Sequence, residues 1–300
     1  MNAVVFPGHG TQYRGMGKDL YDNFPQAKKV FSDIDKILGM EISRICFSGK
    51  REELIDVYNQ QLAILATSLA AYEVFKEKQI NIDFFSGLSL GEYTCLYPAG
   101  VLSFEDLVRL VKKRSEATQE AARLNPSSML AVIGSEKNYL QKLAAKDSFY
   151  IANINSPKQI VVSLKKEDKE RVKSALENSG AKVVELKIAV GFHSPFMEPA
   201  KKLLGEYVKN IEFKQAKIPV VSNLTAKAHA DKDQIKNNLI EQLTSSALWQ
   251  DCVKFMIEEG VDVFFEIGPS RVLRGLIKKI NPEVKVVNIE KKEDLNGVSI

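Results

Sequence analysis

The segment Gly87-Leu88-Ser89-Leu90-Gly91 constrains the fold of this chain more than any other part of its sequence. It follows the apolar residues Phe84-Phe85 and precedes a helix-compatible run, so it fits a sharp turn between a buried strand and a helix. Glycines two positions either side of the serine avoid collisions with neighbouring strands. The pattern predicts a nucleophilic Ser89 at a helix N-terminus, where backbone N–H groups can stabilise an oxyanion. A glycine turn without chemistry is the alternative, because this short pattern is common.

Short apolar runs alternate with amphipathic stretches in much of the chain. Residues 4–6 predict a strand, and residues 24–38 and 60–78 predict helices with apolar side chains at helical spacing. Strands are expected again at residues 218–221 and 261–267. This alternation predicts an α/β fold with a mainly parallel sheet.

Residues 124–192 have a different rhythm. We expect strands at 129–133, 149–154, 159–164 and 182–189, helices at 137–145 and 166–178, and a turn at Asn155-Ser156-Pro157-Lys158. The order β-α-β-β-α-β is the ferredoxin-like pattern. We therefore predict a catalytic domain of residues 1–123 and 193–300, interrupted by an inserted ferredoxin-like subdomain at 124–192.

The composition excludes several classes of protein. The chain has 300 residues, 45% of them hydrophobic and 27% charged, which is typical of a soluble globular protein. No apolar run approaches the roughly 20 residues of a membrane span, and the first residues lack the features of a signal peptide. Cys46, Cys95 and Cys252 form no CxxC pair, which argues against disulfides or zinc and favours the cytoplasm. A net charge of +4 does not require nucleic acid, although local basic patches would suit an acidic protein partner.

An elbow serine needs a general base, and the chain offers three histidines. His229 lies in a polar segment that looks solvated, which leaves His9 and His193. His193 follows the predicted insert, where the chain returns to the main domain and a cleft is expected. A packed loop histidine is an equally good interpretation from spacing alone. Three scattered histidines do not suggest a metal site.

Arg114 lies on the core-facing stripe of a predicted helix. The other members of this stripe recur at three- and four-residue intervals: Leu107, Leu110, Val111, Ala117, Thr118 and Ala121. A buried guanidinium is costly unless it is paired. The pattern alone slightly favours a structural carboxylate as the partner over a substrate carboxylate held by the guanidinium fork.

The glycine-rich loop at residues 8–17 follows the first predicted strand and raises the question of a nucleotide site. The dinucleotide fingerprint would need glycine where Tyr13 stands, and no G-K-[ST] is present for a phosphate loop. The dinucleotide reading therefore fails. A loop whose backbone amides approach an active site remains open.

Six blocks of sequence, in order and over nearly the whole chain, resemble the malonyl-CoA:acyl carrier protein transacylases. They are Phe6-Pro7-Gly8-His9-Gly10-Thr11-Gln12, the G-x-S-L-G-E-Y elbow, Val111-Lys112-Lys113-Arg114, Asn153-Ile154-Asn155-Ser156-Pro157, Phe192-His193-Ser194-Pro195 and Glu266-Ile267-Gly268-Pro269. The resemblance implies an α/β-hydrolase-like large domain with an inserted ferredoxin-like subdomain. It also implies transfer of a malonyl group from malonyl-CoA to the phosphopantetheine thiol of an acidic acyl carrier protein, by a ping-pong mechanism without a cofactor. The carrier would serve fatty-acid or polyketide synthesis.

The same resemblance assigns roles to particular residues. Ser89 would be the nucleophile and His193 its base, and Arg114 would hold the free malonyl carboxylate. The backbone amides of Gln12 and Leu90 would form the oxyanion hole.

Further positions are assigned by the resemblance alone. The carbonyl of Gln242 would orient the histidine in place of an aspartate. Leu90 and Phe192 are the residues associated with malonyl-selective members, and Phe192 would crowd a branched acyl group, a preference worth about 1–3 kcal/mol. The chain departs from the family at Leu88, where histidine is usual, and at His9, where glutamine is usual.

Two other functions are alternatives, and the first of them uses the same Ser89 and His193. An acyl-carrier-protein hydrolase would pass the acyl group to water, and Arg114 argues against it because general hydrolysis does not require binding of a carboxylate. A non-catalytic carrier-binding protein is suggested only by Leu88.

Overall fold

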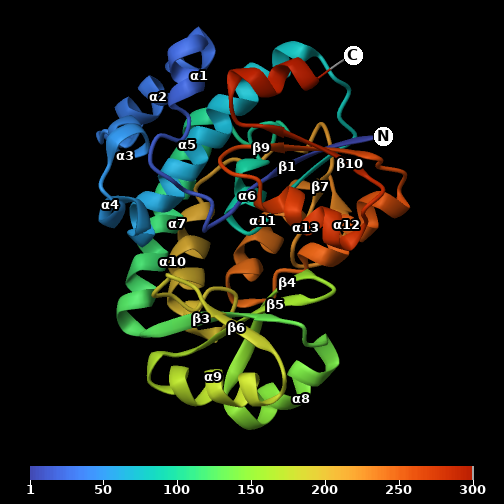
Figure 1. The fold of residues 1–300 in the computed structure, drawn as a ribbon. Helices are drawn as coiled ribbons and strands as arrows, with labels where there is room; N and C mark the ends of the chain where they lie inside the picture. The colour runs from blue at the N-terminus through green and yellow to red at the C-terminus, as the bar shows by residue number, and fades with distance from the viewer. Residues whose placement is uncertain (299–300) are drawn as a thin grey trace.

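A computed structural model describes residues 1–298, which form two β-sheets with their own helices (Figure 1). The larger sheet has the order β10-β9-β1-β2-β7-β8 and is parallel except for β8. Its strands are β1 (Asn2–Phe6), β2 (Phe84–Gly87), β7 (Val220–Val221), β8 (Ala228–His229), β9 (Val263–Ile267) and β10 (Lys285–Ile289). The smaller sheet is antiparallel, in the order β4-β5-β3-β6: β3 (Ser127–Ile133), β4 (Phe149–Ser156), β5 (Gln159–Lys165) and β6 (Lys182–Glu185).

Helices cover both faces of the larger sheet. Along β1, Val4 belongs to the core shared with helix α5, whereas Val5 belongs to the core of helices α12 and α13, because successive strand side chains point to opposite faces. Helix α5 is apolar on nearly all sides and is therefore buried between sheet and neighbouring helices. The helices of this part are α1 (Lys18–Asn23), α2 (Pro25–Leu38), α3 (Ile42–Ser48), α4 (Arg51–Ile55), α5 (Val57–Phe75), α6 (Leu90–Thr94), α7 (Phe104–Leu124), α10 (Glu198–Val208), α11 (Lys232–Glu241), α12 (Trp249–Glu258) and α13 (Val272–Ile280).

The smaller sheet is covered on one face by α8 (Lys137–Asp147) and α9 (Lys169–Asn178), which lie at the far end of the molecule in Figure 1. Leu130 and Val132 of β3 face these helices, while Met129 and Ala131 join the core of the larger part. The sheet therefore has one face for its own core and one face toward the rest of the chain. Short 3₁₀ turns complete the fold: η1 (Lys76–Lys78), η2 (Lys166–Asp168), η3 (Pro195–Met197), η4 (Gln242–Thr244) and η5 (Lys292–Gly297).

The predicted fold class, an α/β chain with a parallel sheet and a ferredoxin-like β-α-β-β-α-β unit, is confirmed. The second sheet and its helices lie within residues 124–192, and those boundaries remain our interpretation. Three predicted strands are too long, and the one expected at 261–267 begins at Val263. The strand expected at 182–189 ends at Glu185, because a tight turn closes from Ile188 N–H to Leu186 O. The strand expected at 218–221 begins at Val220, after a proline that has no N–H to donate.

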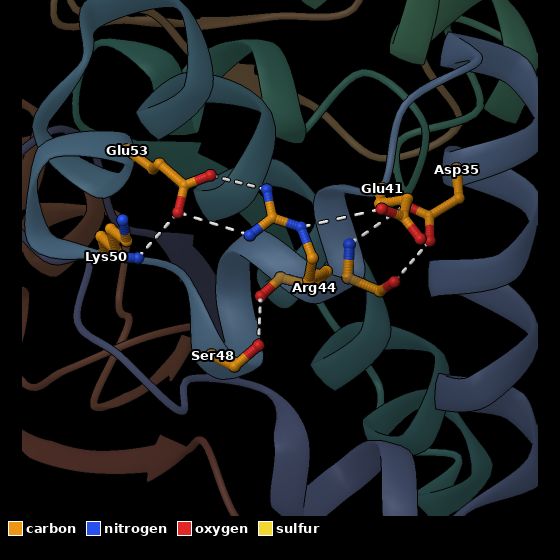
Figure 2. Close-up of polar contacts among 7 residues, drawn as sticks. Asp35, Glu41, Arg44, Ser48, Lys50 and Glu53 are labelled. Carbon is orange, nitrogen blue, oxygen red and sulfur yellow. Dashed lines mark hydrogen bonds and ion pairs between the residues drawn. The ribbon is translucent and has the colours of Figure 1, made fainter.

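A polar cluster on the surface joins α2, α3 and α4 (Figure 2). Arg44 donates to Glu53 at 2.6 Å, and Glu53 also accepts the N–H of Lys50 at 2.8 Å. Asp35 accepts the N–H of Ser43 at 3.0 Å. Because the Arg44 side chain is 47% exposed, solvent screens the ion pair, and its contribution is chiefly to fix the turn between two short helices.

The helices of residues 1–298 include none with both the length and the apolar sequence needed to span a membrane.

Candidate active site

Ser89 and His193 meet at the carboxyl end of β2. The Ser89 Oγ lies 2.8 Å from Nε2 of His193, and both residues are almost fully buried. Ser89 precedes α6 and has φ 55° and ψ −103°, a conformation that non-glycine residues rarely adopt. The strained strand-to-helix turn predicted from the sequence is therefore present, with its hydroxyl directed at an imidazole.

Close backbone packing explains the glycines of the elbow. A Cβ atom on Gly87 would lie 2.2 Å from the carbonyl carbon of Gly91, and one on Gly91 would lie 2.0 Å from the carbonyl oxygen of Phe6. A Cβ on Gly8 would lie 2.3 Å from the carbonyl oxygen of Leu88. The loop after β1 therefore crosses the elbow at a distance that only glycine permits.

Two carbonyl oxygens orient His193. Its Nδ1 lies 2.9 Å from the carbonyl oxygen of Gln242 and 3.2 Å from that of Ser245. Because these oxygens can only accept, Nδ1 carries the proton and Nε2 is free to accept from the Ser89 hydroxyl. Burial, followed by the charge of Arg114, lowers the pKa of His193 to about 4, although the carbonyl contacts act in the opposite direction. The imidazole is thus neutral at physiological pH, as a general base must be.

Arg114 is fully buried beside the serine. Its Nη2 lies 3.2 Å from Ser89 Oγ, its Nη1 donates to Oε1 of Gln61, and its Nε has no partner. The guanidinium stacks 4.8 Å from the ring centre of Tyr93 and 5.9 Å from that of Phe192. The structural carboxylate that the helix pattern slightly favoured is not found, since no carboxylate of residues 1–298 forms an ion pair with Arg114. Arg114 is not among the residues that line the cavity described below, and its Nε is left without a partner beside the Nη2 that contacts Ser89.

A cavity of about 390 Å³ opens onto Ser89 and His193. It lies between the larger part of the molecule and the face of the smaller sheet that is turned toward that part, and α13 forms one wall. Its lining residues are His9, Gly10, Leu88, Ser89, Met129, Ala131, Asn153, Asn155, Gln159, Val161, Leu186, Ile188, Phe192, His193, Arg271, Val272, Gly275, Leu276 and Lys279. A mostly apolar channel with a few polar groups suits a slender acyl or pantetheine chain.

The glycine loop contributes His9 and Gly10 to this lining, while Gln12 is not part of it. The Gln12 side chain instead donates to Gln60 at 3.1 Å and accepts the N–H of Gly10 at 2.9 Å. Leu90 is fully buried at the first position of α6, where its N–H is one of the unpaired donors of the helix. The role predicted for the Gln12 backbone amide stays a prediction.

His9, the second histidine left open by the sequence, does not bond to Ser89. Its ring lies against that of Phe192, with centroids 4.6 Å apart, and its Nε2 is buried without a partner. Burial and the charges of Arg114 and His193 keep its pKa well below the usual value. His9 is therefore a neutral wall of the cavity, whereas His229 lies apart from the site and bonds to neighbouring surface residues.

Leu88, which departs from the family pattern, lies in the cavity wall and packs against the core of α12 and α13. It removes no polar contact from the Ser89–His193 pair. Among residues 1–298, no group of three or more His, Cys, Asp or Glu side chains is arranged to hold a metal ion.

Three further residues of the site were missed by sequence reasoning. Gln61 bonds to Arg114, Asn223 accepts the backbone N–H of Ser89 at 2.7 Å, and the buried Glu92 accepts the backbone N–H of Asn223. Gln61 could have been noticed as a polar residue within the apolar α5. Glu92 could have been noticed as an acidic residue within the helix that follows Ser89. Asn223 had no comparable signal, because it lies in a loop far along the chain.

A strained serine at the end of a parallel strand, paired with a neutral histidine, is the arrangement of enzymes that form an acyl-serine. The comparisons with known proteins agree with this class. Residues 3–293 match the model of the acyl transferase domain, and the chain belongs to that family.

Individual relatives show which members of this family the chain is similar to. The chain is 40% identical over 299 residues to the malonyl CoA-acyl carrier protein transacylase of Bacillus subtilis strain 168, covering 98% of this chain and 94% of that protein. It superposes on the crystal structure of the enzyme of that name from Clostridium perfringens with a TM-score of 0.93 and 33% identity, covering 99% and 95% of the two chains. A malonyl-transacylase solved in complex with a type II PKS acyl-carrier protein gives a TM-score of 0.94 at 34% identity, covering 98% and 97%.

Proposed function

We propose that this chain transfers a malonyl group from malonyl-CoA to the phosphopantetheine thiol of an acyl carrier protein, through an ester on Ser89. The observation that carries this proposal is the position of Arg114, a fully buried guanidinium beside Ser89 with an unpaired Nε. A buried cation without a carboxylate is costly. An acyl group that brings its own carboxylate would supply the missing partner.

The first half of the reaction acylates the serine. His193 Nε2 takes the hydroxyl proton of Ser89 as Oγ attacks the thioester carbon of malonyl-CoA. Backbone N–H groups of Leu90 and of the glycine loop, where we predicted Gln12, stabilise the oxyanion of the tetrahedral intermediate. The intermediate collapses with cleavage of the C–S bond, and His193 returns its proton to the departing CoA thiolate.

The second half reverses these steps with a different thiol. The phosphopantetheine thiol of the carrier gives its proton to His193 and attacks the malonyl ester, and Ser89 recovers the proton as the C–O bond breaks. Arg114 holds the carboxylate in both halves and so fixes the acyl group against the nucleophile. We further propose that no metal or cofactor takes part, because exchange between a thioester and an ester needs only a base and oxyanion donors.

The proposed partner is acidic, and the cavity offers it positive charge. Lys279 lies on α13 and Arg271 directly precedes this helix, and both residues line the cavity. Phosphate groups and acidic carrier surfaces would be attracted to them. Phe192, between His9 and Arg114, is the proposed barrier to branched acyl groups. A cytoplasmic location is proposed because the three cysteines are free thiols, which a reducing compartment preserves.

The test is incubation with radiolabelled malonyl-CoA, with and without holo acyl carrier protein, using wild type and Ser89→Ala. We expect wild type to retain label and pass it to the carrier, and Ser89→Ala to remain unlabelled. Label recovered as free malonate, with or without the carrier, would show that the chain is a hydrolase and not a transferase. Absence of both label and malonate would indicate a protein that binds carriers without catalysis.

A further inference from the structure

Glu92 is a buried acid in the elbow helix for which the mechanism above has no role. It lies three residues after Ser89 in α6 and is 2% exposed. Its Oε2 accepts two hydrogen bonds, from the backbone N–H of Asn223 at 2.9 Å and from Nε2 of Gln242 at 2.5 Å. One oxygen atom therefore joins two segments that are distant from the elbow in the sequence.

Each of these two segments holds one member of the catalytic pair. The side-chain oxygen of Asn223 accepts the N–H of Ser89 at 2.7 Å, and its amide nitrogen donates to the carbonyl of Gly87 at 2.8 Å. The backbone oxygen of Gln242 accepts Nδ1–H of His193 at 2.9 Å. Glu92 is thus connected to the nucleophile through Asn223 and to the base through Gln242.

The backbone at both catalytic residues needs such support. Ser89 has φ 55° and His193 has φ 56°, and positive φ values are uncommon for residues other than glycine. Conformations of this kind persist only where surrounding contacts fix them. At Ser89 one such contact runs from its N–H through Asn223 to Glu92, whereas at His193 the contact that leads to Glu92 is made by the imidazole with Gln242.

We propose that Glu92 is a positioning residue for malonyl transfer, which sets the Ser89–His193 geometry through Asn223 and Gln242. Through Gln242, Glu92 provides the acidic group that His193 lacks as a direct hydrogen-bond partner. The proposal rests on the proposed function for its substrate, while its geometry applies to any acyl transfer to Ser89.

The protonation state of Glu92 matters to this arrangement. Burial raises its pKa to about 7, against the lowering effects of the N–H of Asn223, the amide of Gln242, the hydroxyl of Ser222 and the charge of Arg114 on α7. The ionised carboxylate can accept from both donors, whereas the protonated form has less acceptor capacity. The other ionisable groups that interact with it are Tyr93 and Cys95 from its own segment and Cys252 on α12.

The test measures acylation of Ser89 by malonyl-CoA in rapid-quench experiments from about pH 5.5 to about pH 9, for wild type, Glu92→Gln and Glu92→Ala. Cys95→Ala is the matched control, because its thiol is equally buried beside α6 and takes no part in the Glu92 contacts. We expect Glu92→Ala to lower the maximal acylation rate about 100-fold with little change in KM, the scale of effect of a misplaced reacting group. Glu92→Gln keeps an acceptor oxygen and should recover part of that loss.

The pH profile separates positioning from general support of the fold. Wild type and Cys95→Ala should both show a rise in rate through about pH 7, as Glu92 ionises, and Glu92→Gln should lack it. The proposal fails if Glu92→Ala loses no more rate than Cys95→Ala at equal folded fraction, or if the inflection persists in Glu92→Gln. Because acyl-serine formation is measured directly, this outcome does not depend on whether the acyl group later goes to a carrier or to water.

Discussion

Replacement of Arg114 by methionine gives the sharpest test of how this site recognises an acyl group. Methionine has a similar length without the charge, so the fully buried position stays filled. The structure shows which guanidinium nitrogen lacks a partner. Nη1 is used by Gln61, Nε is unpaired, and Nη2 has Ser89 Oγ at 3.2 Å, a contact that changes when the hydroxyl becomes an ester.

The size of the expected effect follows from the hydrogen bonds that a carboxylate would form with Nε and Nη2. A carboxylate bound side-on to Nε and Nη2 accepts two charge-assisted hydrogen bonds, each worth about 1.5–3 kcal/mol. Removal of the carboxylate from water offsets part of that gain, which leaves a net of about 3 kcal/mol. At about 1.4 kcal/mol per factor of ten, Arg114→Met should lower the preference for malonyl over acetyl about 100-fold.

The assay compares kcat/KM for malonyl-CoA and acetyl-CoA in formation of the acyl-serine. Nearly all of the loss should fall on malonyl-CoA, because acetyl-CoA has no carboxylate to bind. Arg109→Met is the control, since Arg109 lies on the same helix but is 51% exposed and paired with Glu105. An unchanged malonyl-to-acetyl ratio in Arg114→Met, or an equal fall for both substrates, would refute carboxylate recognition by this residue.

Three further predictions concern titration and packing. In the Glu92→Gln background the acylation rate should stay level from about pH 8 to about pH 5 and fall below it, because His193, with its pKa lowered to about 4, is protonated only there; a fall centred near its ordinary pKa would contradict this. Burial raises the pKa of Glu266 to about 7, so the native state keeps a proton that the unfolded state releases above about pH 4.5. Denaturant titrations should therefore show that wild type loses about 3 kcal/mol of unfolding free energy relative to Glu266→Gln between pH 5 and 8. Parallel curves of unfolding free energy against pH for the two proteins would count against this prediction. Gly91→Ala would place a Cβ 2.0 Å from a β1 carbonyl oxygen and should cost about 3 kcal/mol in thermal or denaturant unfolding, whereas Gly275→Ala, with no atom within 4 Å of its Cβ, should be tolerated; equal stability of the two variants would refute the packing argument.

Much of the fold could be predicted because its signals are local. The elbow glycines, the helix at 24–38 and the order of elements in 124–192 depend on periodicity and turn chemistry within a few residues. The errors were in the bounds of strands. The strand predicted beyond Glu185 stops where a tight turn closes between Leu186 and Ile188, which the apolar pattern of the segment did not reveal.

The site could be predicted in part. The pattern placed Arg114 on a buried stripe, but it slightly favoured a carboxylate of the protein as its partner. The family resemblance pointed to the carbonyl of Gln242, and the structure places that carbonyl 2.9 Å from Nδ1 of His193. The role predicted for Gln12 stays a prediction, although the cavity is lined by the neighbouring part of its loop.

The sequence by itself determined the class of fold, the strained serine and the presence of an arginine on a core-facing stripe. These properties arise within single elements, where backbone geometry and side-chain period are fixed by local chemistry. Spacing alone left His9 and His193 open, and only the family resemblance pointed to His193. The tertiary structure places His193, which is 104 residues from Ser89, beside the serine hydroxyl. It also brought in Asn223, 134 residues from the serine whose N–H it accepts. Such distances are set by strand order and by packing between elements, which no local pattern specifies.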